Sequence, residues 1–353
     1  MSKLTNILAA GLVALAPSLT FAAGEGWLDD YDVAVAQAKE QGKDLLVDFT
    51  GSDWCTWCIR LDEEVFAHAE FSDYAKEHYV LVALDFPNAE EIKAKVPNPE
   101  RNQELSELYG VQGFPTILLV NVDGDVFGRT GYRQGGPGPY VEYMKTLAVD
   151  GKAALAAAKA DVARLDEAVE GERMGVLASL IDAYEALDPA SDMDAIRKPV
   201  LKGAVMRAID LDPDNAAGMK LRAVKTLLVA GDAGADVVAI ATELDPKNEH
   251  GLYELVVKGR LNAMRSIEDV ADFVDAVHGL DELGIRDEAV AIDLYANCAW
   301  VCWQHLDRKQ EAIDFANKGL ALEPEDGSTV TMLKDLLARL APEEEPAGEA
   351  PAE

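Results

Sequence analysis

The sequence predicts an α/β domain followed by an all-α helical-repeat domain. Residues 27–147 alternate helix-forming stretches with short apolar runs rich in β-branched residues, which is the pattern of a sheet covered by helices. From about Gly151 those runs vanish, and helices rich in Ala, Leu, Asp and Glu follow one another with short turns. A length of 353 residues agrees with about two domains.

The α/β part is expected to form a mixed sheet, because one crossover unit is followed by a hairpin turn at Asp123-Gly124. Asp29 or Asp30 is expected to cap the first helix, and Gly42 to end it. A proline-containing loop insertion is expected at 87–102. Helices are predicted at 27–41, from 57 onward, and at 71–78, 104–109 and 140–147; strands are predicted at 45–49, 79–85, 117–121 and 125–131.

The helical part carries a recurring proline turn. Leu211-Asp212-Pro213 and Leu244-Asp245-Pro246 lie 33 residues apart, close to the 34-residue period of tetratricopeptide repeats. A third turn, Leu322-Glu323-Pro324, closes the best single match to such a repeat, residues 299–326. We therefore expect an imperfect, tetratricopeptide-like helical-repeat domain at 151–341. The acidic residues 342–353, with five Glu and no basic residue, are expected to be a disordered tail.

The first 22 residues have the pattern of a signal peptide, with Lys3 before an apolar run at 7–16 and a small-x-small site at 20–22. That run is far shorter than the roughly 20 apolar residues of a membrane span. The mature protein is therefore expected to be periplasmic or secreted, with no membrane span after signal removal. A formal charge of −32 argues against nucleic acid and acidic membrane surfaces as partners.

The sequence Trp54-Cys55-Thr56-Trp57-Cys58 carries the chemistry, because two cysteines one helical turn apart follow directly on a predicted strand. At the first turn of a helix, unpaired N–H groups and the helix dipole favour thiolate over thiol. The second cysteine can then close an intramolecular disulfide and release a mixed-disulfide partner. In an oxidising compartment a passive disulfide is the alternative, but a passive bridge seldom lies at the start of a helix.

The main alternative role for these cysteines is zinc binding, and a structural zinc site needs four protein ligands. The only other cysteines, Cys298 and Cys302, belong to the predicted helical domain, so no metal site is expected. They fall on one helix face, where burial as small hydrophobic residues is favoured. A disulfide within that helix, or a second redox centre, are the alternatives. Trp300 and Trp303 are expected to be packing residues of a repeat.

Residues 43–66, together with Gly113-Phe114-Pro115-Thr116, resemble the thioredoxin-like family. The closest similarity is to the exported subgroup with Trp-Cys-x-Trp-Cys and a Leu-Asp-Phe-Pro segment after the second strand. The resemblance covers 27–147 and implies a thioredoxin fold for the domain at 23–150. The helical part is not covered.

The resemblance also implies roles for individual residues. Cys55 would be the exposed nucleophile, and Cys58 the buried resolving thiol. Pro115 would be a cis-proline facing the dithiol, which leaves the backbone of Phe114 free to pair with a substrate strand. Asp48 would be the buried acid that takes a proton from Cys58. One departure is an extra residue between Asp48 and Cys55, which bears on whether Asp48 reaches Cys58.

The residues around the two cysteines are expected to tune the reaction. Thr56-Trp57 places no histidine between the sulfurs, which favours reduction. Trp54 and Trp57 are expected to form an apolar rim that receives substrate. Arg60 is expected either to stabilise a Cys55 thiolate or to be an ordinary surface cation.

Together these features predict an exported thiol–disulfide oxidoreductase that exchanges the Cys55–Cys58 dithiol or disulfide with exported, cysteine-containing client proteins in the reducing direction. The redox-active disulfide would itself be the redox group, so no cofactor is expected. A membrane electron donor or acceptor is a candidate partner. The alternative is a repeat-based interaction module on a redox-silent thioredoxin-like platform.

Overall fold

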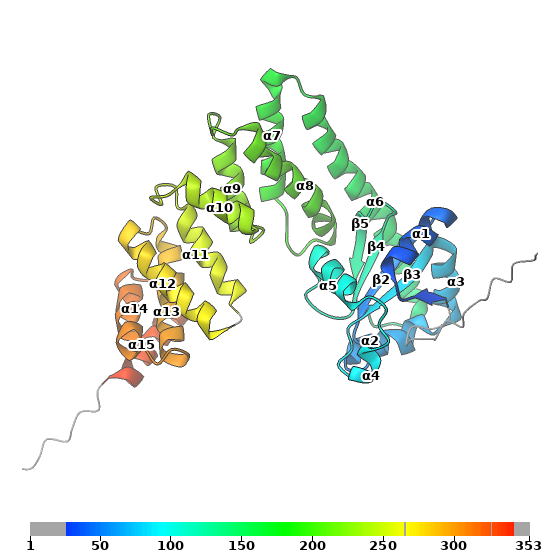
Figure 1. Cartoon of the computed structure of the whole chain (residues 1–353), viewed down its shortest axis with the longest axis horizontal. Coiled ribbons are helices and arrows are strands. Elements are labelled where there is room, and N and C mark those ends of the chain that lie inside the picture. Colours follow the sequence, from blue (N-terminus) through cyan, green and yellow to red (C-terminus); the bar gives the residue numbers. More distant parts are fainter. Residues whose placement is uncertain (1–25, 265, 326, 342–353) are drawn as a thin grey trace, which may run out of the picture. The chain divides into compact units, whose positions relative to one another are not determined.

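The computed structural model describes residues 26–264, 266–325 and 327–341, so the predicted signal peptide and acidic tail lie outside the described residues. The chain divides into two compact units. The first unit runs to Lys159 and includes Asp188–Arg197, and the second contains Ala160–Leu187 and the chain from Lys198 onward. Figure 1 shows the strands gathered in the first unit, whereas the second unit is built from helices.

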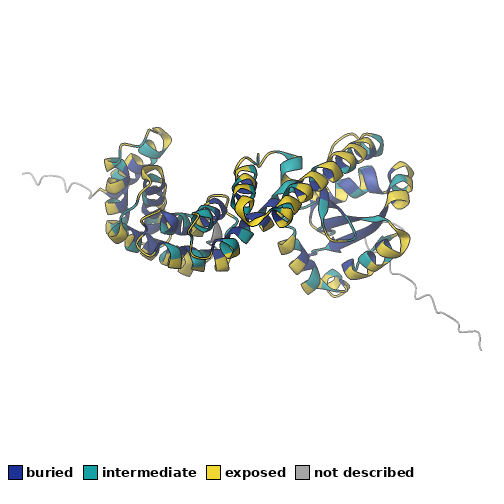
Figure 2. Cartoon of the chain, turned by 90° about the horizontal axis from the view of Figure 1, so that it is seen from above, coloured by how far each residue is buried: buried dark blue, intermediate teal, exposed yellow. Residues whose placement is uncertain are grey.

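A five-stranded mixed sheet lies at the centre of the first unit, with the strand order β1-β3-β2-β4-β5. The first three strands in that order are parallel, and β4 and β5 run antiparallel to their neighbours. The apolar runs of β2 and β3 are almost wholly buried, because helices cover both faces of the sheet, and Figure 2 shows these buried strands inside the unit. The strand bounds are β1 Trp27–Leu28, β2 Asp44–Thr50, β3 Tyr79–Asp85, β4 Thr116–Val120 and β5 Val126–Thr130.

Helices connect and cover these strands. Asp30 caps the first helix and Gly42 ends it in the left-handed conformation, as the sequence predicts. The helix after the cysteine pair continues into a π-helical turn, labelled η1. The bounds are α1 Tyr31–Gln41, α2 Thr56–Leu61, η1 Asp62–Phe66, α3 Ala69–His78, α4 Glu90–Lys93, α5 Pro99–Leu108 and α6 Pro137–Glu167.

Two local predictions in this unit are wrong. The first helix starts only at Tyr31, because Trp27 and Leu28 pair with β3 as an edge strand. The Trp27 ring packs 5.1 Å from that of Phe66, a contact between distant parts of the chain that no local pattern reveals. The expected loop at 87–102 contains α4 and the start of α5, since Pro99 begins that helix at a position where its missing N–H costs nothing.

The predicted end of the last helix at Leu147 is also wrong, because α6 continues through Gly151 to Glu167. Gly151 marks a close contact. A Cβ at this position would lie 1.6 Å from the carbonyl oxygen of Phe127 on β5. Glycine is therefore needed for α6 to pack against the sheet. The predicted boundary at residue 150 falls inside this helix, and the division into independently folding domains at 23–150 and 151–341 stays a prediction.

The second unit consists of packed helices with two apolar clusters. One cluster is formed by buried residues from Leu165 to Val256, the other by buried residues from Val257 to Leu340. None of the helices in the described part of the chain is long and apolar enough to cross a membrane. This unit contains the end of α6 and the part of α8 (Asp192–Leu211) that follows Arg197. Its other helices are α7 Glu170–Glu185, α9 Met219–Val229, α10 Ala235–Leu244, α11 Leu252–Ala263, α12 Ile267–Leu283, α13 Glu288–Gln304, α14 Lys309–Ala321 and α15 Gly327–Leu340.

Two of the three proline turns have the same structure. Asp212 accepts hydrogen bonds from the backbone N–H groups of Ala217 and Met219, and Asp245 accepts them from Glu249, His250 and Leu252. Each turn thus satisfies N–H groups at or just before the start of the next helix.

Three residues after each aspartate, an asparagine takes a left-handed conformation, with φ 54° at both Asn215 and Asn248. The third turn differs, since its left-handed residue is Glu323, at φ 51°. The 33-residue recurrence is therefore structural for the first two turns. The tetratricopeptide character of the whole domain stays a prediction.

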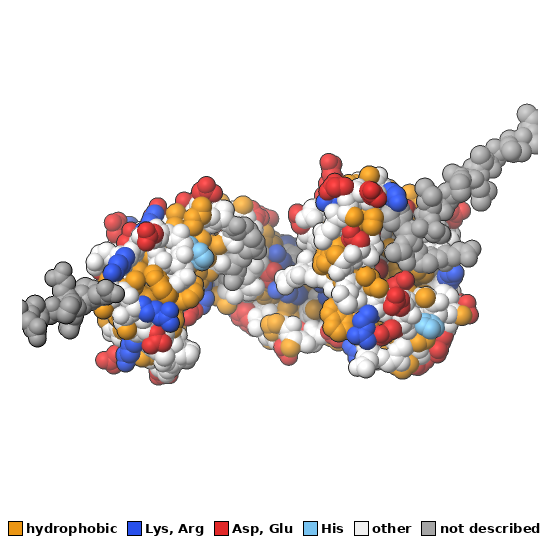
Figure 3. All heavy atoms as spheres, turned by 90° about the horizontal axis from the view of Figure 1, so that it is seen from below, with side chains coloured by type: hydrophobic (Ala, Val, Ile, Leu, Met, Phe, Trp, Pro, Cys, Tyr) orange, Lys and Arg blue, Asp and Glu red, His pale blue; other side chains and the backbone are white. Residues whose placement is uncertain are grey.

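The surface of both units is acidic, in keeping with the formal charge of −32. On the face shown in Figure 3, acidic side chains lie among hydrophobic ones on each unit.

The exposure of one aromatic residue, Trp300, differs from the prediction. Trp300 is 43% exposed, so it is not a buried packing residue, although its ring meets that of Trp303 at 5.5 Å.

Candidate redox-active site

The Cys55–Cys58 pair lies where β2 leads into α2, and the two sulfurs form a disulfide, with the Cα atoms 5.2 Å apart. Cys55 occupies the N-cap position of α2, and its Sγ accepts a hydrogen bond from the backbone N–H of Cys58 at 3.2 Å. The same N–H also donates to the backbone carbonyl oxygen of Cys55 at 3.0 Å, so it is shared between the sulfur and that oxygen. The same contact would stabilise a Cys55 thiolate once the disulfide is opened.

The expected contrast between an exposed Cys55 and a buried Cys58 is wrong for this disulfide form, because each residue is 5% exposed. The two sulfurs are bonded to each other, and Trp54 and Trp57 flank Cys55 in the chain. Burial therefore does not decide which sulfur a thiol attacks. The two sulfurs still differ in position, because Cys55 lies at the N-cap of α2 and Cys58 lies within the helix.

The loop before Cys55 is fixed by two aspartates. Asp85, at the end of β3, accepts hydrogen bonds from both the backbone N–H and the hydroxyl of Ser52, at 2.9 and 2.6 Å. Asp53 accepts from the backbone N–H groups of Asn88 and Ala89, at 2.9 and 2.7 Å. These backbone hydrogen bonds lower the pKa of Asp53. These hydrogen bonds anchor the turn before Cys55 to the end of β3 and to the segment that follows it.

Trp54 belongs to an aromatic cluster that we call the first wall, formed by Trp54, Phe86 and Phe114. The indole N–H donates to the carbonyl oxygen of Phe86 at 2.8 Å, and the ring meets Phe114 edge-on at 5.7 Å. Phe86 and Phe114 are 5.1 Å apart. A Cβ on Gly51 would lie 2.6 Å from the indole, so only glycine lets the ring lie there. Trp54 remains 45% exposed.

Trp57 belongs to a separate cluster, the second wall, formed by Trp57, Arg60, Glu64 and Tyr132. The Arg60 guanidinium lies 5.2 Å from the ring centres of both Trp57 and Tyr132. Glu64 accepts from Arg60 at 2.8 Å and from the Tyr132 hydroxyl at 2.6 Å, and these bonds lower the pKa of Glu64. Trp57 is 51% exposed. Arg60 is therefore paired with Glu64 and is not a free surface cation.

The segment 113–116 brings the predicted proline to this region. The Phe114–Pro115 peptide bond is cis, which agrees with the geometry expected for Pro115. The Thr116 hydroxyl donates to the carbonyl oxygen of Gly113 at 2.8 Å and fixes the turn. Phe114 joins the segment to the first wall through its contact with Trp54. The structure thus links Trp54, Phe114 and the cis bond, while the part each plays in the reaction stays a prediction.

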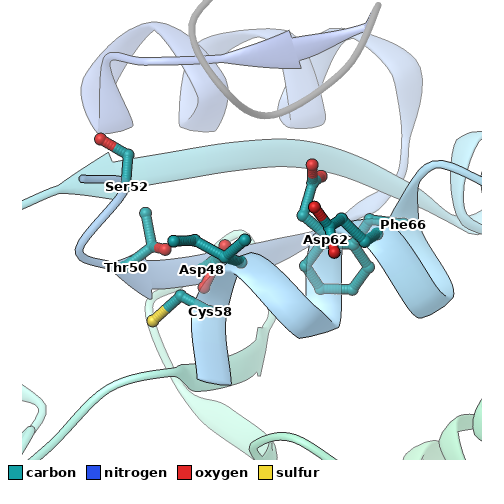
Figure 4. Close-up of a pocket in the computed structure, with 8 residues that line it drawn as sticks. Asp48, Thr50, Ser52, Cys58, Asp62 and Phe66 are labelled. Atoms are coloured by element: carbon teal, nitrogen blue, oxygen red, sulfur yellow. The ribbon is translucent and has the colours of Figure 1, made fainter. Parts of the chain in front are cut away.

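Asp48 and Cys58 line the same pocket, which has a volume of about 240 Å³. Figure 4 shows Cys58 of α2 beside Asp48 of β2, with Asp62 and Phe66 on η1, the turn that follows α2. The extra residue before Cys55 therefore does not separate the predicted acid from the predicted resolving cysteine.

Asp48 is 6% exposed, and its Oδ1 has no hydrogen-bond partner in the described part of the chain. Burial, and then the charges of Asp62 and Asp85, raise the pKa of Asp48 to about 8. The carboxyl group is therefore mostly protonated at neutral pH. Whether this acid exchanges a proton with Cys58 stays a prediction.

Asp62 is a site residue that sequence reasoning missed. Half-burial, and then the charge of Glu63, raise its pKa, and it lines the same pocket as Asp48. Its position four residues after Cys58 was the available signal, since residues four apart share one helix face.

Cys298 and Cys302 are not part of this site. They are free and wholly buried in the second unit, as favoured from the sequence. Burial raises the pKa of both thiols, that of Cys302 to about 11, so neither is activated as a thiolate. Within residues 26–264, 266–325 and 327–341, no group of three or more His, Cys, Asp or Glu side chains is arranged to hold a metal ion.

Comparison with known proteins places this site in a family. A model of the thioredoxin-like domain matches residues 31–136. Disulfide bond reductase DsbH of Chlamydia pneumoniae is 35% identical over 120 residues, which are 33% of this chain and 70% of that protein. The chain belongs to the thioredoxin-like family.

The chain covers a smaller share of two other relatives. Thioredoxin H-type of Oryza sativa subsp. indica is 34% identical over 26% of this chain and 61% of that protein. Thiol:disulfide interchange protein DsbD of Vibrio cholerae is 31% identical over 28% of this chain and 14% of that protein. A solved structure described as DsbH oxidoreductase has 32% identity and a TM-score of 0.31, covering 38% of this chain and 92% of that one.

The family assignment concerns the thioredoxin-like domain, because the matching model ends at residue 136. A Cys-x-x-Cys disulfide at the start of α2 in this fold, within this family, makes the protein a thiol–disulfide oxidoreductase. The helical part has no such assignment.

Proposed function

We propose that the protein is an exported reductase, which passes two electrons from a Cys55–Cys58 dithiol to disulfides in exported client proteins. The observation that carries the proposal is the Cys55 sulfur at the N-cap of α2, in contact with the Cys58 N–H. The reducing direction is supported by the absence of histidine between the sulfurs, and by similarity to a relative named as a disulfide bond reductase. Export to the periplasm or medium is supported by the signal-peptide pattern in residues 1–22.

In the proposed reaction the Cys55 thiolate attacks one sulfur of the client disulfide. The client S–S bond breaks, one client sulfur leaves as a thiolate, and a mixed disulfide joins Cys55 to the other. Cys58 then loses its proton and attacks the Cys55 sulfur, which releases the second client thiolate and forms the enzyme disulfide. The client gains two electrons and, from the site and solvent, two protons. A dithiol donor must then reduce Cys55–Cys58 again, and a membrane electron donor is the partner we propose.

Asp48 is the proposed proton carrier for Cys58. When the donor opens the enzyme disulfide, the protonated Asp48 carboxyl can give its proton to the Cys58 sulfur in the shared pocket. In client reduction the carboxylate takes that proton back, so that Cys58 becomes nucleophilic. Asp62 keeps the proton on Asp48 over a wider pH range through like-charge repulsion.

The client would be held beside Pro115. We propose that the backbone of Phe114 pairs with an extended client segment and that the exposed Trp54 and Trp57 rings contact its side chains. The helical-repeat domain would dock a client or redox partner. Under the alternative hypothesis, the thioredoxin-like part is redox-silent and the protein acts only by binding partners through the helical-repeat domain.

A trapping experiment tests the proposal in the full mature chain. Cys58→Ser leaves Cys55 able to attack but removes the resolving thiol, so mixed disulfides with exported proteins should accumulate. The Cys55→Ser/Cys58→Ser double variant is the control and should trap nothing. If the single variant traps no client while the helical domain still retains a binding partner, the interaction-module hypothesis is correct instead.

The direction is tested by equilibrating the Cys55–Cys58 pair against thiol buffers. A reduction potential near or below about −250 mV supports a reductase that must be supplied with electrons. A potential above about −180 mV identifies an oxidase or isomerase and overturns the proposed direction.

A further inference from the structure

In the second wall, the exposed Trp57 is held by contacts with several other side chains. Trp57 is the second residue between the two cysteines, and its ring lies 5.1 Å from that of Tyr132, which follows β5 in the chain. The Arg60 guanidinium lies over both rings. The cluster therefore ties the redox-active turn to a segment more than 70 residues away in the sequence.

Glu64 completes the cluster as its acceptor. It takes hydrogen bonds from Arg60 on its own helical segment and from the hydroxyl of Tyr132. The positive charge of Arg60 is thus balanced before any ligand arrives, although the Arg60 and Glu64 side chains remain 44% and 36% exposed. An apolar side chain can pack on Trp57 without burying an unpaired charge.

We propose that Arg60, Glu64 and Tyr132 hold Trp57 in place as a specificity-determining surface, which selects client segments with a large apolar or aromatic side chain next to the reacting cysteine. This inference rests on the proposed reductase function. Arg60, Glu64 and Tyr132 are positioning residues, and Trp57 is the residue that would touch the client.

The chemistry of the two walls favours an apolar client side chain over a charged one. Trp54 and Trp57, which precede and follow Cys55 in the chain, each expose about half of their surface. Exposing an aromatic ring to water is unfavourable, and contact with an apolar client side chain would bury that surface. Acidic residues Asp53, Asp62 and Glu63 lie in the same stretch of sequence and would repel an acidic segment. A pre-ordered ring also loses little entropy on binding.

The experiment compares two oxidised peptides that differ only in having Phe or Ala beside the reacting cysteine, with hydroxyethyl disulfide as a probe that has no side chain to place on the wall. The mature full-length protein should show a KM about threefold to tenfold lower for the Phe peptide, the size of one aromatic contact. Trp57→Ala should remove that preference. Tyr132→Phe keeps the ring but loses the bond to Glu64, and should reduce the preference in part.

Tyr74→Phe, on α3 and outside both walls, is the matched control and should keep the wild-type preference. Turnover of hydroxyethyl disulfide and the Cys55–Cys58 potential should also be unchanged in Tyr74→Phe. In Tyr132→Phe the KM of the Phe peptide should rise more than the KM of the Ala peptide, which a merely structural role would not predict.

Equal KM values for the two peptides in the wild type, or an equal rise in KM for both peptides in Tyr132→Phe, would overturn this inference alone. If the wild type reduces neither peptide nor hydroxyethyl disulfide, the proposed function fails and this inference fails with it.

Discussion

Replacing Asp48 by Asn should stabilise the thioredoxin-like domain and remove a large part of its pH dependence. Asn has nearly the same shape as a protonated Asp but cannot ionise. In the folded protein the carboxyl group of Asp48 has a pKa of about 8, raised from 3.8 mainly by burial. Its contribution to stability is fully present below the unfolded pKa and is lost as pH rises toward 8.

The magnitude follows from the two pKa values. Each pKa unit corresponds to 1.36 kcal/mol, so the raised pKa of Asp48 costs about 4 kcal/mol of stability at pH 7, where the unfolded carboxyl is ionised and the folded one is mostly protonated, and about 6 kcal/mol at pH 9. At pH 5 the cost is only about 2 kcal/mol. The advantage of Asp48→Asn over wild type should therefore grow by about 4 kcal/mol between pH 5 and pH 9.

The assay is urea unfolding of the oxidised protein, followed by tryptophan fluorescence. Three of the five tryptophans lie in the first unit, so a Trp300→Phe/Trp303→Phe background confines the signal to that unit. Thr50→Val, at another residue lining the same pocket, is a control that changes polarity without changing a titrating group. An advantage of Asp48→Asn that stays constant from pH 5 to pH 9 would refute the assignment of a raised pKa to this carboxyl group.

Three further predictions follow from particular contacts. Asp62→Asn removes the like charge that helps to raise the pKa of Asp48, so in the same assay the pH-dependent loss of stability should end at a lower pH and be smaller in total; an unchanged profile would contradict that coupling. Gly151→Ala should destabilise the first unit by about 3 kcal/mol or more because its Cβ meets Phe127, whereas Gly175→Ala, with open space around it in α7, should be neutral or stabilising by up to about 1 kcal/mol, as compared by thermal unfolding. Asp212→Ala and Asp245→Ala should each cost about 1–3 kcal/mol in urea unfolding of the second unit, since each leaves helix-start N–H groups unpaired; a large effect at only one site would show that the two turns are not equivalent.

Much of the fold could be predicted because its signals are local. The apolar runs at 45–49 and 79–85 lie within β2 and β3, and Gly42 ends α1 where the pattern indicates. The same is true of the two cysteines at a strand-to-helix junction. Errors occurred where a long-range contact decided the outcome, as at Trp27, which forms an edge strand against β3, and at Gly151, which packs α6 on β5.

The candidate site divides in the same way. Cys55, Cys58, Asp48, Trp54 and Trp57 could be proposed from their order along the chain and from the family resemblance. Their burial could not, and the exposure expected for Cys55 was wrong in the disulfide form.

The sequence by itself determined the dithiol chemistry of this protein, because Cys-x-x-Cys spacing on a helix brings two sulfurs within bonding distance whatever surrounds them. Only the tertiary structure decided the setting of that dithiol. It brought Asp62 and Asp48 to the lining of one pocket, anchored the loop before Cys55 to the end of β3 by hydrogen bonds, and brought Tyr132 to Trp57. Such contacts join residues far apart in the chain, so they depend on how strands pair and helices pack rather than on any local pattern.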